Sequence, residues 1–114
     1  MNIAVVYPEV YDIAKFGDKR KEFPPFGVMY LAASIERAGM PVKLLKISPE
    51  NTRLDLRDYD AVAFSIPSSV TYPVVKECRF TSLYSENALI MAGGIHANIY
   101  PEETLLDLQV DVLG

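Results

Sequence analysis

Short apolar runs alternate with longer mixed segments along this chain. Five largely apolar runs, rich in β-branched residues, occupy residues 3–7, 42–47, 61–66, 88–92 and 110–113. Continuous apolar runs of this length are typical of strands buried on both faces of a parallel sheet. Because short runs alone do not exclude buried helix, the segments between them decide the assignment.

The segment after the first run predicts a helix over residues 25–38. An apolar stripe at helical spacing is formed by Val28, Leu31, Ala32, Ile35 and Ala38. Pro25 suits a helix start, where its missing N–H costs nothing, and Gly39 suits the left-handed residue that follows a helix. Pro41 prevents continuation of the helix.

Two further helices are predicted downstream. A less regular one covers residues 72–84, and another opens at Pro101 with acidic residues at the positive end of its dipole. The apolar positions expected to be buried are Val74, Val75, Cys78, Leu105 and Leu108. The polar stretch 48–59 is consistent with either a loop or a short helix.

This alternation predicts one α/β domain over residues 1–114: a flavodoxin-like, doubly wound parallel sheet of five strands in the order 2-1-3-4-5. Ligands of such sheets bind at the carboxyl ends of strands 1 and 3, where the winding reverses. Gly114 directly follows the fifth strand, and a doubly wound sheet needs a further helix there. We therefore expect a fragment of a longer polypeptide, or association through the uncovered sheet edge.

Composition and charge limit the partners and the cellular location that we expect for this protein. A net charge of −4 argues against nucleic-acid or anionic-membrane partners. No apolar run is long enough to span a bilayer, and the amino terminus lacks the features of a signal peptide. Cys78 is the only cysteine, so the chain forms no internal disulfide and no four-thiolate metal site. We expect a cytoplasmic protein.

Two loops at the predicted carboxyl edge supply the candidate cofactor-binding residues. Hydroxyl groups after the third strand offer adaptable donors and acceptors, or cap the next helix through Ser69 or Thr71. Paired glycines after the fourth strand either let a bulky ligand lie on the backbone or form a tight turn. The candidates are Ser65, Pro67, Ser68, Ser69, Val70, Gly93, Gly94, Ile95 and His96.

The loop after the first strand and the histidine suggest two further hypotheses about function. The loop 8–24 contains Lys15, Lys19, Arg20 and Lys21, which suit a lid over an anionic or amide-rich ligand or a solvated charge run. His96 is the only histidine, and no acidic residue or second histidine lies close to it in sequence. We expect no catalytic residue and no metal site in this chain.

The chain lacks the residues that several other protein classes with similar folds need for their function. A phosphate-accepting receiver domain needs an acidic cluster after strand 1 and an Asp at the end of strand 3. A flavodoxin needs a short hydroxyl-rich phosphate loop after strand 1. Neither the dinucleotide-binding G-x-G-x-x-G motif nor the P-loop motif occurs.

The combined motifs resemble the cobalamin-binding domains attached to radical S-adenosylmethionine (SAM) enzymes. The resemblance runs through residues 24–33 (PPFGVMYLAA), the Ser65-x-x-Ser68-Ser69 segment, residues 93–97 (GGIHA) with 101–103 (PEE), and residues 110–114 (VDVLG). It covers nearly the whole chain in the right order.

The resemblance implies cobalamin with its nucleotide tail between segments 65–70 and 93–96. Residues 8–24 contain no histidine, so the D-x-H-x-x-G ligand of other cobalamin proteins is missing and histidine-off binding is implied. It further implies a C-terminal radical SAM domain in cis, with SAM and a [4Fe-4S] cluster, in a methyltransferase or related Fe-S oxidoreductase. The alternative is a flavodoxin-like sensory or protein-interaction module that does not bind cobalamin.

Overall fold

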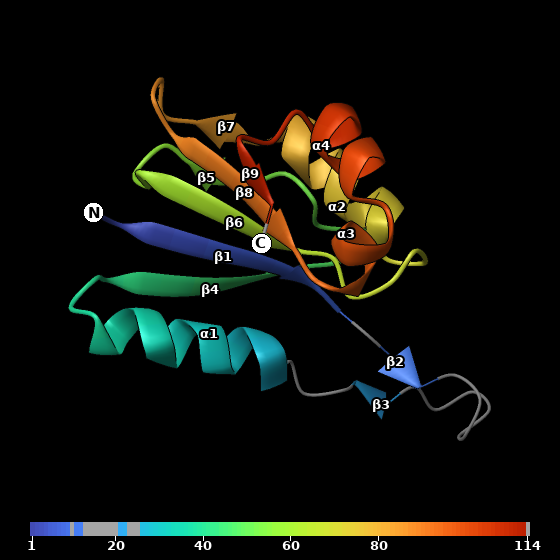
Figure 1. Cartoon of the computed structure of the whole chain (residues 1–114), viewed down its shortest axis with the longest axis horizontal. Helices are drawn as coiled ribbons and strands as arrows, with labels where there is room; N and C mark the ends of the chain where they lie inside the picture. The colour runs from blue at the N-terminus through green and yellow to red at the C-terminus, as the bar shows by residue number, and fades with distance from the viewer. Residues whose placement is uncertain (10, 13–20, 23–25, 114) are drawn as a thin grey trace.

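A five-stranded parallel sheet forms the centre of the molecule (Figure 1). The computed structural model describes residues 1–9, 11–12, 21–22 and 26–113. The sheet strands are β1 (Ile3–Pro8), β4 (Val42–Ile47), β6 (Ala61–Ser65), β8 (Leu89–Gly93) and β9 (Val112–Leu113). Their spatial order is β4-β1-β6-β8-β9, and all four pairings are parallel. Numbered within this sheet, the order is 2-1-3-4-5, which confirms the predicted topology.

Helices cover both faces of the sheet, as expected of a doubly wound fold. Helix α1 (Phe26–Arg37) lies against β1 and β4 on one face (Figure 1). Helices α2 (Tyr72–Thr81), α3 (Ile95–Ile99) and α4 (Pro101–Leu108) lie on the opposite side. The α/β fold class is therefore confirmed.

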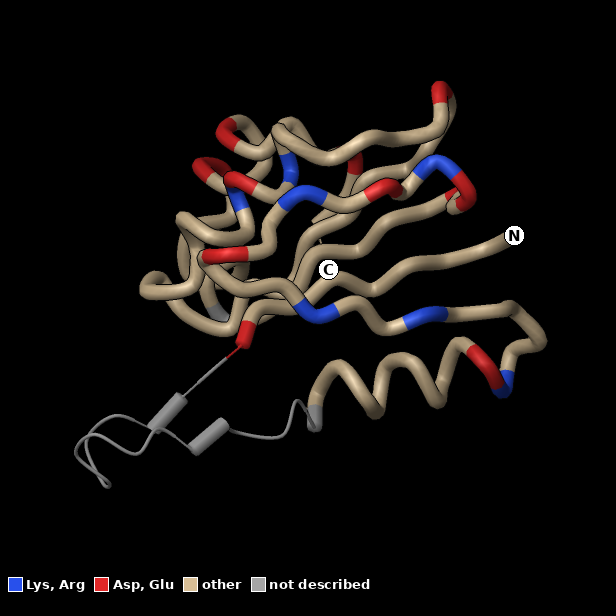
Figure 2. The backbone as a smooth tube through the Cα atoms, turned by 180° about the vertical axis from the view of Figure 1, so that it is seen from behind, with Lys and Arg blue, Asp and Glu red and all other residues tan. Residues whose placement is uncertain are grey.

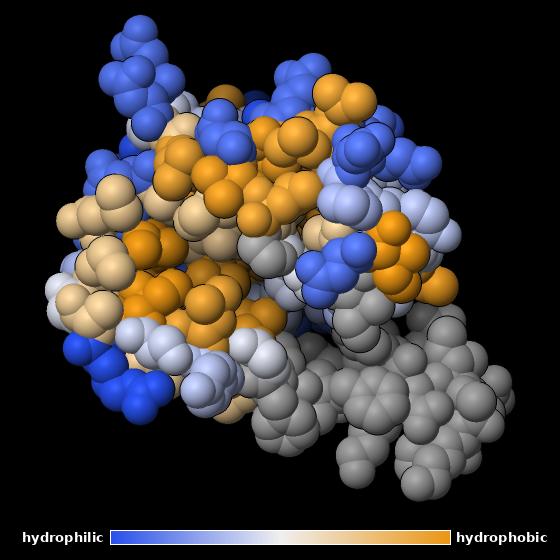
Figure 3. Space-filling model, viewed as in Figure 1, coloured by the Kyte–Doolittle hydropathy of each residue, from blue (hydrophilic) through white to orange (hydrophobic). Residues whose placement is uncertain are grey.

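Helix α1 buries a narrower stripe than its sequence predicted. Val28 and Ala32 are buried, whereas Leu31 is 45% exposed and Ala38 lies beyond the helix end. Gly39 has the expected positive φ, 85°. The charged residues of α1 lie at its C-terminal end (Figure 2). Apolar side chains gather beside the helix on the surface that Figure 3 shows. The prediction that Leu31 is buried was wrong: α1 makes its main contacts with β4 and β1, and Leu31 lies outside the buried stripe.

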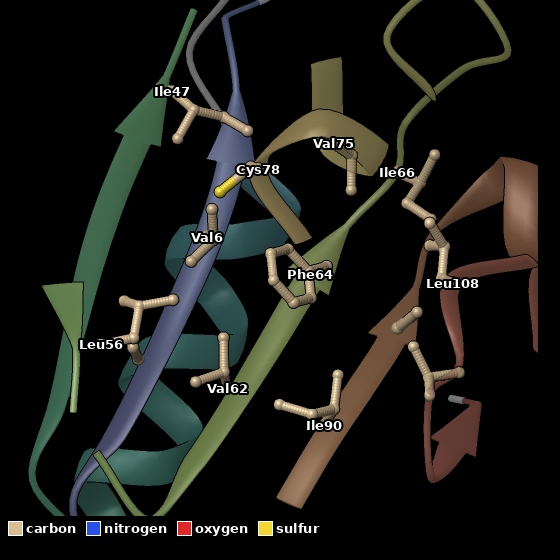
Figure 4. Packing of buried hydrophobic residues seen from close by; sticks show 13 residues of the cluster. Val6, Ile47, Leu56, Val62, Phe64, Ile66, Val75, Cys78, Ile90 and Leu108 are labelled. Atoms are coloured by element: carbon tan, nitrogen blue, oxygen red, sulfur yellow. The ribbon is translucent and has the colours of Figure 1, made fainter. Parts of the chain in front are cut away.

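The core consists of two clusters separated by the sheet. Alternate residues of β1 enter different clusters: Ile3 and Val5 face α1, whereas Ala4 and Val6 face α2. Burial on both faces explains why the strand sequences are continuously apolar. Phe64 is the largest fully buried side chain of the α2 side (Figure 4), and burying a side chain of this size contributes roughly 2 kcal/mol.

The segment between β4 and β6 is a loop, one of its two predicted forms, apart from one two-residue strand. Strand β5 (Asp55–Leu56) pairs in parallel with β7 (Leu83–Tyr84), beside the main sheet. The prediction of helix through residue 84 was therefore wrong. Helix α2 stops at Thr81 because the backbone N–H of Leu83 donates to the carbonyl of Leu54 at 2.9 Å.

The remaining elements are short or begin where predicted. Helix α4 starts at Pro101, but its buried residues are Thr104 and Leu108, whereas Leu105 is exposed. Helix α3 was not predicted, since five residues are too few to show a period. Strands β2 (Tyr11–Asp12) and β3 (Lys21–Glu22) form a separate antiparallel pair.

Candidate ligand-binding site

The ends of β6 and β8 bring the two candidate loops together at the carboxyl edge. Ser65 pairs with Gly93 in the parallel register, and the N–H of Ile66 donates to the carbonyl of Gly93 at 2.8 Å. Side chains alternate along strands, so Ser65 and Gly93 share the α1-facing side with Ala63 and Met91. A residue with a small side chain, Ser65, thus lies next to a residue without one, Gly93, on the same face of the sheet.

Gly94 makes a close contact within the chain. Its φ is 107°, and a Cβ added there would lie 2.6 Å from the carbonyl oxygen of Ile66. The N–H of His96 also donates to this carbonyl at 3.1 Å. The end of β6 therefore fills the space next to the α-carbon of Gly94, and a ligand cannot lie on the backbone there.

The loop from Ser65 to α2 is held by a hydroxyl turn. Thr71 occupies the N-cap position of α2 without a side-chain capping bond, so its predicted capping role was wrong. Its hydroxyl instead donates to the carbonyl of Ser68 at 3.0 Å, and its N–H donates to the Ser68 hydroxyl at 3.3 Å. The tip of the loop is open to solvent, with Val70 87% exposed.

His96 lies in an aromatic and hydroxyl environment at the start of α3. Its ring stacks on Tyr72 with centroids 4.3 Å apart, and Tyr100 packs against it at 5.2 Å. The Ser69 hydroxyl lies 3.0 Å from Nδ1. The structure thus joins two predicted site residues, Ser69 and His96, with two tyrosines that the sequence did not single out.

Tyr72 is in turn held by a polar network between α2 and α4. Its hydroxyl donates to Asp107, which also accepts a hydrogen bond from Lys76 at 2.8 Å. Lys76 and Tyr72 together lower the pKa of the Asp107 carboxyl. Burial, reinforced by the Asp107 bond, raises the pKa of Tyr72. The phenol therefore stays neutral and keeps donating across the usual pH range.

A groove of about 270 Å³ opens on the α2 side of the same edge. Its lining combines apolar walls, two hydroxyls and two carboxylates: Pro8, Glu9, Ile47, Ser48, Pro49, Glu50, Val70, Thr71 and Val74. Of the predicted set it contains only Val70. The position of Glu9 directly after strand 1 was the signal that could have found it. One of the carboxylates, Glu9, lies 3.8 Å from the Lys46 ammonium. Because the lining contains two carboxylates, it favours amide or cationic groups over phosphate.

Some predicted features lie outside what the structure describes. Lys15, Lys19 and Arg20 of the hypothetical lid fall among the residues that are not described, as does the side chain of Ile95. Within the described ranges, no cluster of three or more His, Cys, Asp or Glu residues suits a metal ion. No helix in these ranges is both long and apolar enough to cross a membrane.

These features define the class of protein. A parallel sheet wound in two directions from β1, with small and hydroxyl residues where the winding reverses, is an α/β ligand-binding domain. Residues 18–114 match the B12 binding domain family; the chain belongs to that family and is a cobalamin-binding domain. A search of curated proteins and a search of solved structures found no match.

Proposed function

We propose that this chain binds cobalamin in a histidine-off form, with the nucleotide tail between segments 65–70 and 93–96. The observation that carries the proposal is the pairing of Ser65 with Gly93 at the carboxyl edge. Gly93 has no side chain, and Ser65 offers a hydroxyl beside it. A pair of residues with so little side-chain bulk suits a large group, and family membership supports the choice of that group.

The residues present fit cobalamin. On the α1 side of the sheet, Ala63, Ser65 and Gly93 are small, and no described helix covers β6 and β8 there. The tail would be held by this surface and by the hydroxyls of the following loop. The corrin rim carries many primary amides, whose N–H groups suit the Glu9 and Glu50 carboxylates of the groove. When bound, cobalamin supplies a cobalt centre able to carry a methyl group.

The proposed absence of a histidine ligand follows from where histidine occurs. The only histidine is His96, after β8, whereas residues 8–24 after β1 contain none. The Ser69 hydroxyl already engages one nitrogen of His96. The rings of Tyr72 and Tyr100 pack against the imidazole. We therefore assign His96 to the binding wall rather than to the cobalt.

The proposed context is a cytoplasmic radical SAM enzyme, a methyltransferase or related Fe-S oxidoreductase. In this proposal the chain is its cobalamin-binding part, and a C-terminal domain in cis supplies SAM chemistry and the [4Fe-4S] cluster. Cys78 is buried and is the only cysteine, so it does not provide a set of cluster ligands. A C-x-x-x-C-x-x-C motif encoded after Gly114 would support this context, and its absence would contradict it.

Calorimetric titration with hydroxocobalamin tests binding, and electron paramagnetic resonance of bound cob(II)alamin tests ligation. We expect saturable binding and no nitrogen splitting of the cobalt signal. Gly93→Val, which places an isopropyl group on the proposed surface, should weaken binding at least tenfold. Ala33→Val adds similar bulk at an exposed position of α1 and should not. If Gly93→Val bound cobalamin as tightly as the unaltered chain, the proposed tail site at Ser65 and Gly93 would be refuted. Nitrogen splitting of the cobalt signal would refute histidine-off ligation.

A further inference from the structure

Helix α4 exposes most of its circumference to solvent. Thr104 and Leu108 are its buried residues, and they lie about one turn apart on the side that meets the rest of the protein. Successive residues of a helix are about 100° apart, so Glu102 and Leu106 lie on the outer side. Leu106 is 77% exposed, and Leu105 beside it is exposed as well. The outer side of α4 is therefore partly apolar.

The charge of the C-terminal third of the chain has one sign. All 11 Lys and Arg residues lie within residues 1–79, whereas residues 80–114 contain five Asp and Glu residues and neither Lys nor Arg. Two of these five, Glu102 and Glu103, lie in the first turn of α4. Within the described part of the chain neither of them makes an ion pair. The net negative charge of the chain is thus concentrated in the segment that contains α4.

The exposed leucines and the carboxylates of α4 form one mixed surface. We call it the α4 surface, and it consists of Glu102, Glu103, Leu105 and Leu106. Single exposed apolar residues are common in proteins, and acidic residues in a first turn stabilise the helix dipole. Neither explanation accounts for two adjacent exposed leucines next to carboxylates without an ion pair. Apolar contacts bordered by charge of one sign suit a partner of the opposite sign.

The α4 surface favours a partner that is itself helical and basic. The backbone of a helix is hydrogen-bonded internally, so α4 offers no strand edge to an extended peptide and contact must be made by side chains. An amphipathic helix presents apolar and charged side chains at the spacing needed to meet leucines and carboxylates together. Lys and Arg complement Glu102 and Glu103, whereas nucleic acid and anionic lipid would be repelled.

We propose that the α4 surface is a docking site for a basic amphipathic helix of another protein. Leu105 and Leu106 contact the apolar side of that helix, and Glu102 and Glu103 pair with its Lys or Arg side chains. The site lies on the side of the sheet opposite to α1 (Figure 1). The proposal does not depend on whether the chain binds cobalamin.

Fluorescence anisotropy of a labelled synthetic peptide tests this docking site on the full 114-residue chain. The probe is a helix-forming peptide with leucine along one face and lysine along the other. A peptide of the same composition in scrambled order and a leucine–glutamate analogue serve as comparisons. We expect saturable binding of the leucine–lysine helix that weakens as salt is raised, and much weaker binding of both comparison peptides.

Variants of the chain locate the contact. Leu106→Gln should weaken binding of the leucine–lysine helix at least about fivefold, as for the loss of a central apolar contact. Glu102→Gln combined with Glu103→Gln should weaken binding and reduce its salt dependence. The controls are Met29→Gln at an exposed apolar residue of α1 and Glu86→Gln at an exposed acidic residue outside α4, and both should leave binding unchanged.

Three results would overturn the proposal. Equal binding of the ordered and scrambled peptides would show that net charge alone causes the attraction. The second is a lack of saturable binding by the unaltered chain. The third is an equal loss in Met29→Gln and Leu106→Gln, which would place the contact outside α4. Circular dichroism of each variant verifies that the chain is folded.

Discussion

Gly94 shows how the conformation of one residue shapes the candidate site. Its positive φ turns the chain from β8 into α3, and its lack of a Cβ lets the end of β6 approach. Through this contact the Ile66 carbonyl accepts the N–H of His96. One glycine therefore positions both walls of the proposed tail groove relative to each other.

We expect Gly94→Ala to lower the free energy of unfolding by roughly 1–3 kcal/mol, because the new Cβ would lie 2.6 Å from a backbone oxygen at an unfavourable φ. Urea unfolding followed by circular dichroism measures the loss. Gly27→Ala is the matched control, since nothing lies within 4 Å of its added Cβ. In a helix that change should stabilise by roughly 0.5 kcal/mol. Equal effects of the two changes would contradict the close contact.

At the scale of elements, Arg79 and Tyr84 connect α2, β7 and the end of α4. The Arg79 guanidinium donates to the carbonyls of Leu108 and Gln109, at 2.9 and 3.1 Å, where α4 ends. It also lies over the Tyr84 ring, 4.9 Å from the centroid. The Tyr84 hydroxyl donates to the Arg79 carbonyl at 2.6 Å. This arrangement holds the β5–β7 pair against the helical layer.

Tyr84 should make the protein sensitive to alkaline pH. Burial raises its pKa to about 12, above the ordinary 10. The folded state then holds the phenolic proton more tightly than the unfolded state, so this stability is complete below pH 10 and is lost as pH rises towards 12. We expect Tyr84→Phe to reduce the fall in unfolding free energy across that window, as measured by urea unfolding at several pH values.

The control for this prediction is Tyr30→Phe, because Tyr30 is exposed on α1. It should leave the pH dependence unchanged. Tyr84→Phe also removes a hydrogen bond and should cost about 1 kcal/mol below pH 10, so the slope above pH 10 rather than the absolute stability carries the test. An unchanged slope in Tyr84→Phe would show that another group dominates the alkaline loss.

At the scale of the whole molecule, the two faces of the sheet are unequally covered. On the α1 side, Leu89, Met91 and Val112 continue the apolar surface beyond the strands that α1 covers. Figure 3 shows apolar side chains gathered on this face. Strand β9 is also an edge strand, and exposed apolar edges promote pairing with a second chain.

We therefore expect the 114-residue chain to self-associate with increasing concentration in sedimentation velocity. Val112→Lys introduces charge at a residue that is 45% exposed on this face and should shift the distribution towards monomer. Leu106→Lys makes a comparable change on the exposed side of α4 and should not. Association that responds equally to both substitutions would place the contact elsewhere.

How much the sequence predicted depended on the range of the interactions. Strand and helix periods are local, so the five sheet strands, their order and the positive φ at Gly39 were predicted correctly. Strand β7 was missed because Leu83 pairs with a segment near residue 54 that carries no strand period of its own. The exposure of Leu31 depended on how much of the sheet one helix covers.

The sequence by itself determined the α/β topology, the small and hydroxyl residues after the third and fourth sheet strands, and the lack of histidine in residues 8–24. These follow from residue identity and chain order alone. Only the tertiary structure decided that Ser69 meets His96, that Tyr72 supports its ring, and that Glu9 and Glu50 line one groove. Such contacts join segments far apart in the chain, and their geometry depends on how all the layers pack together.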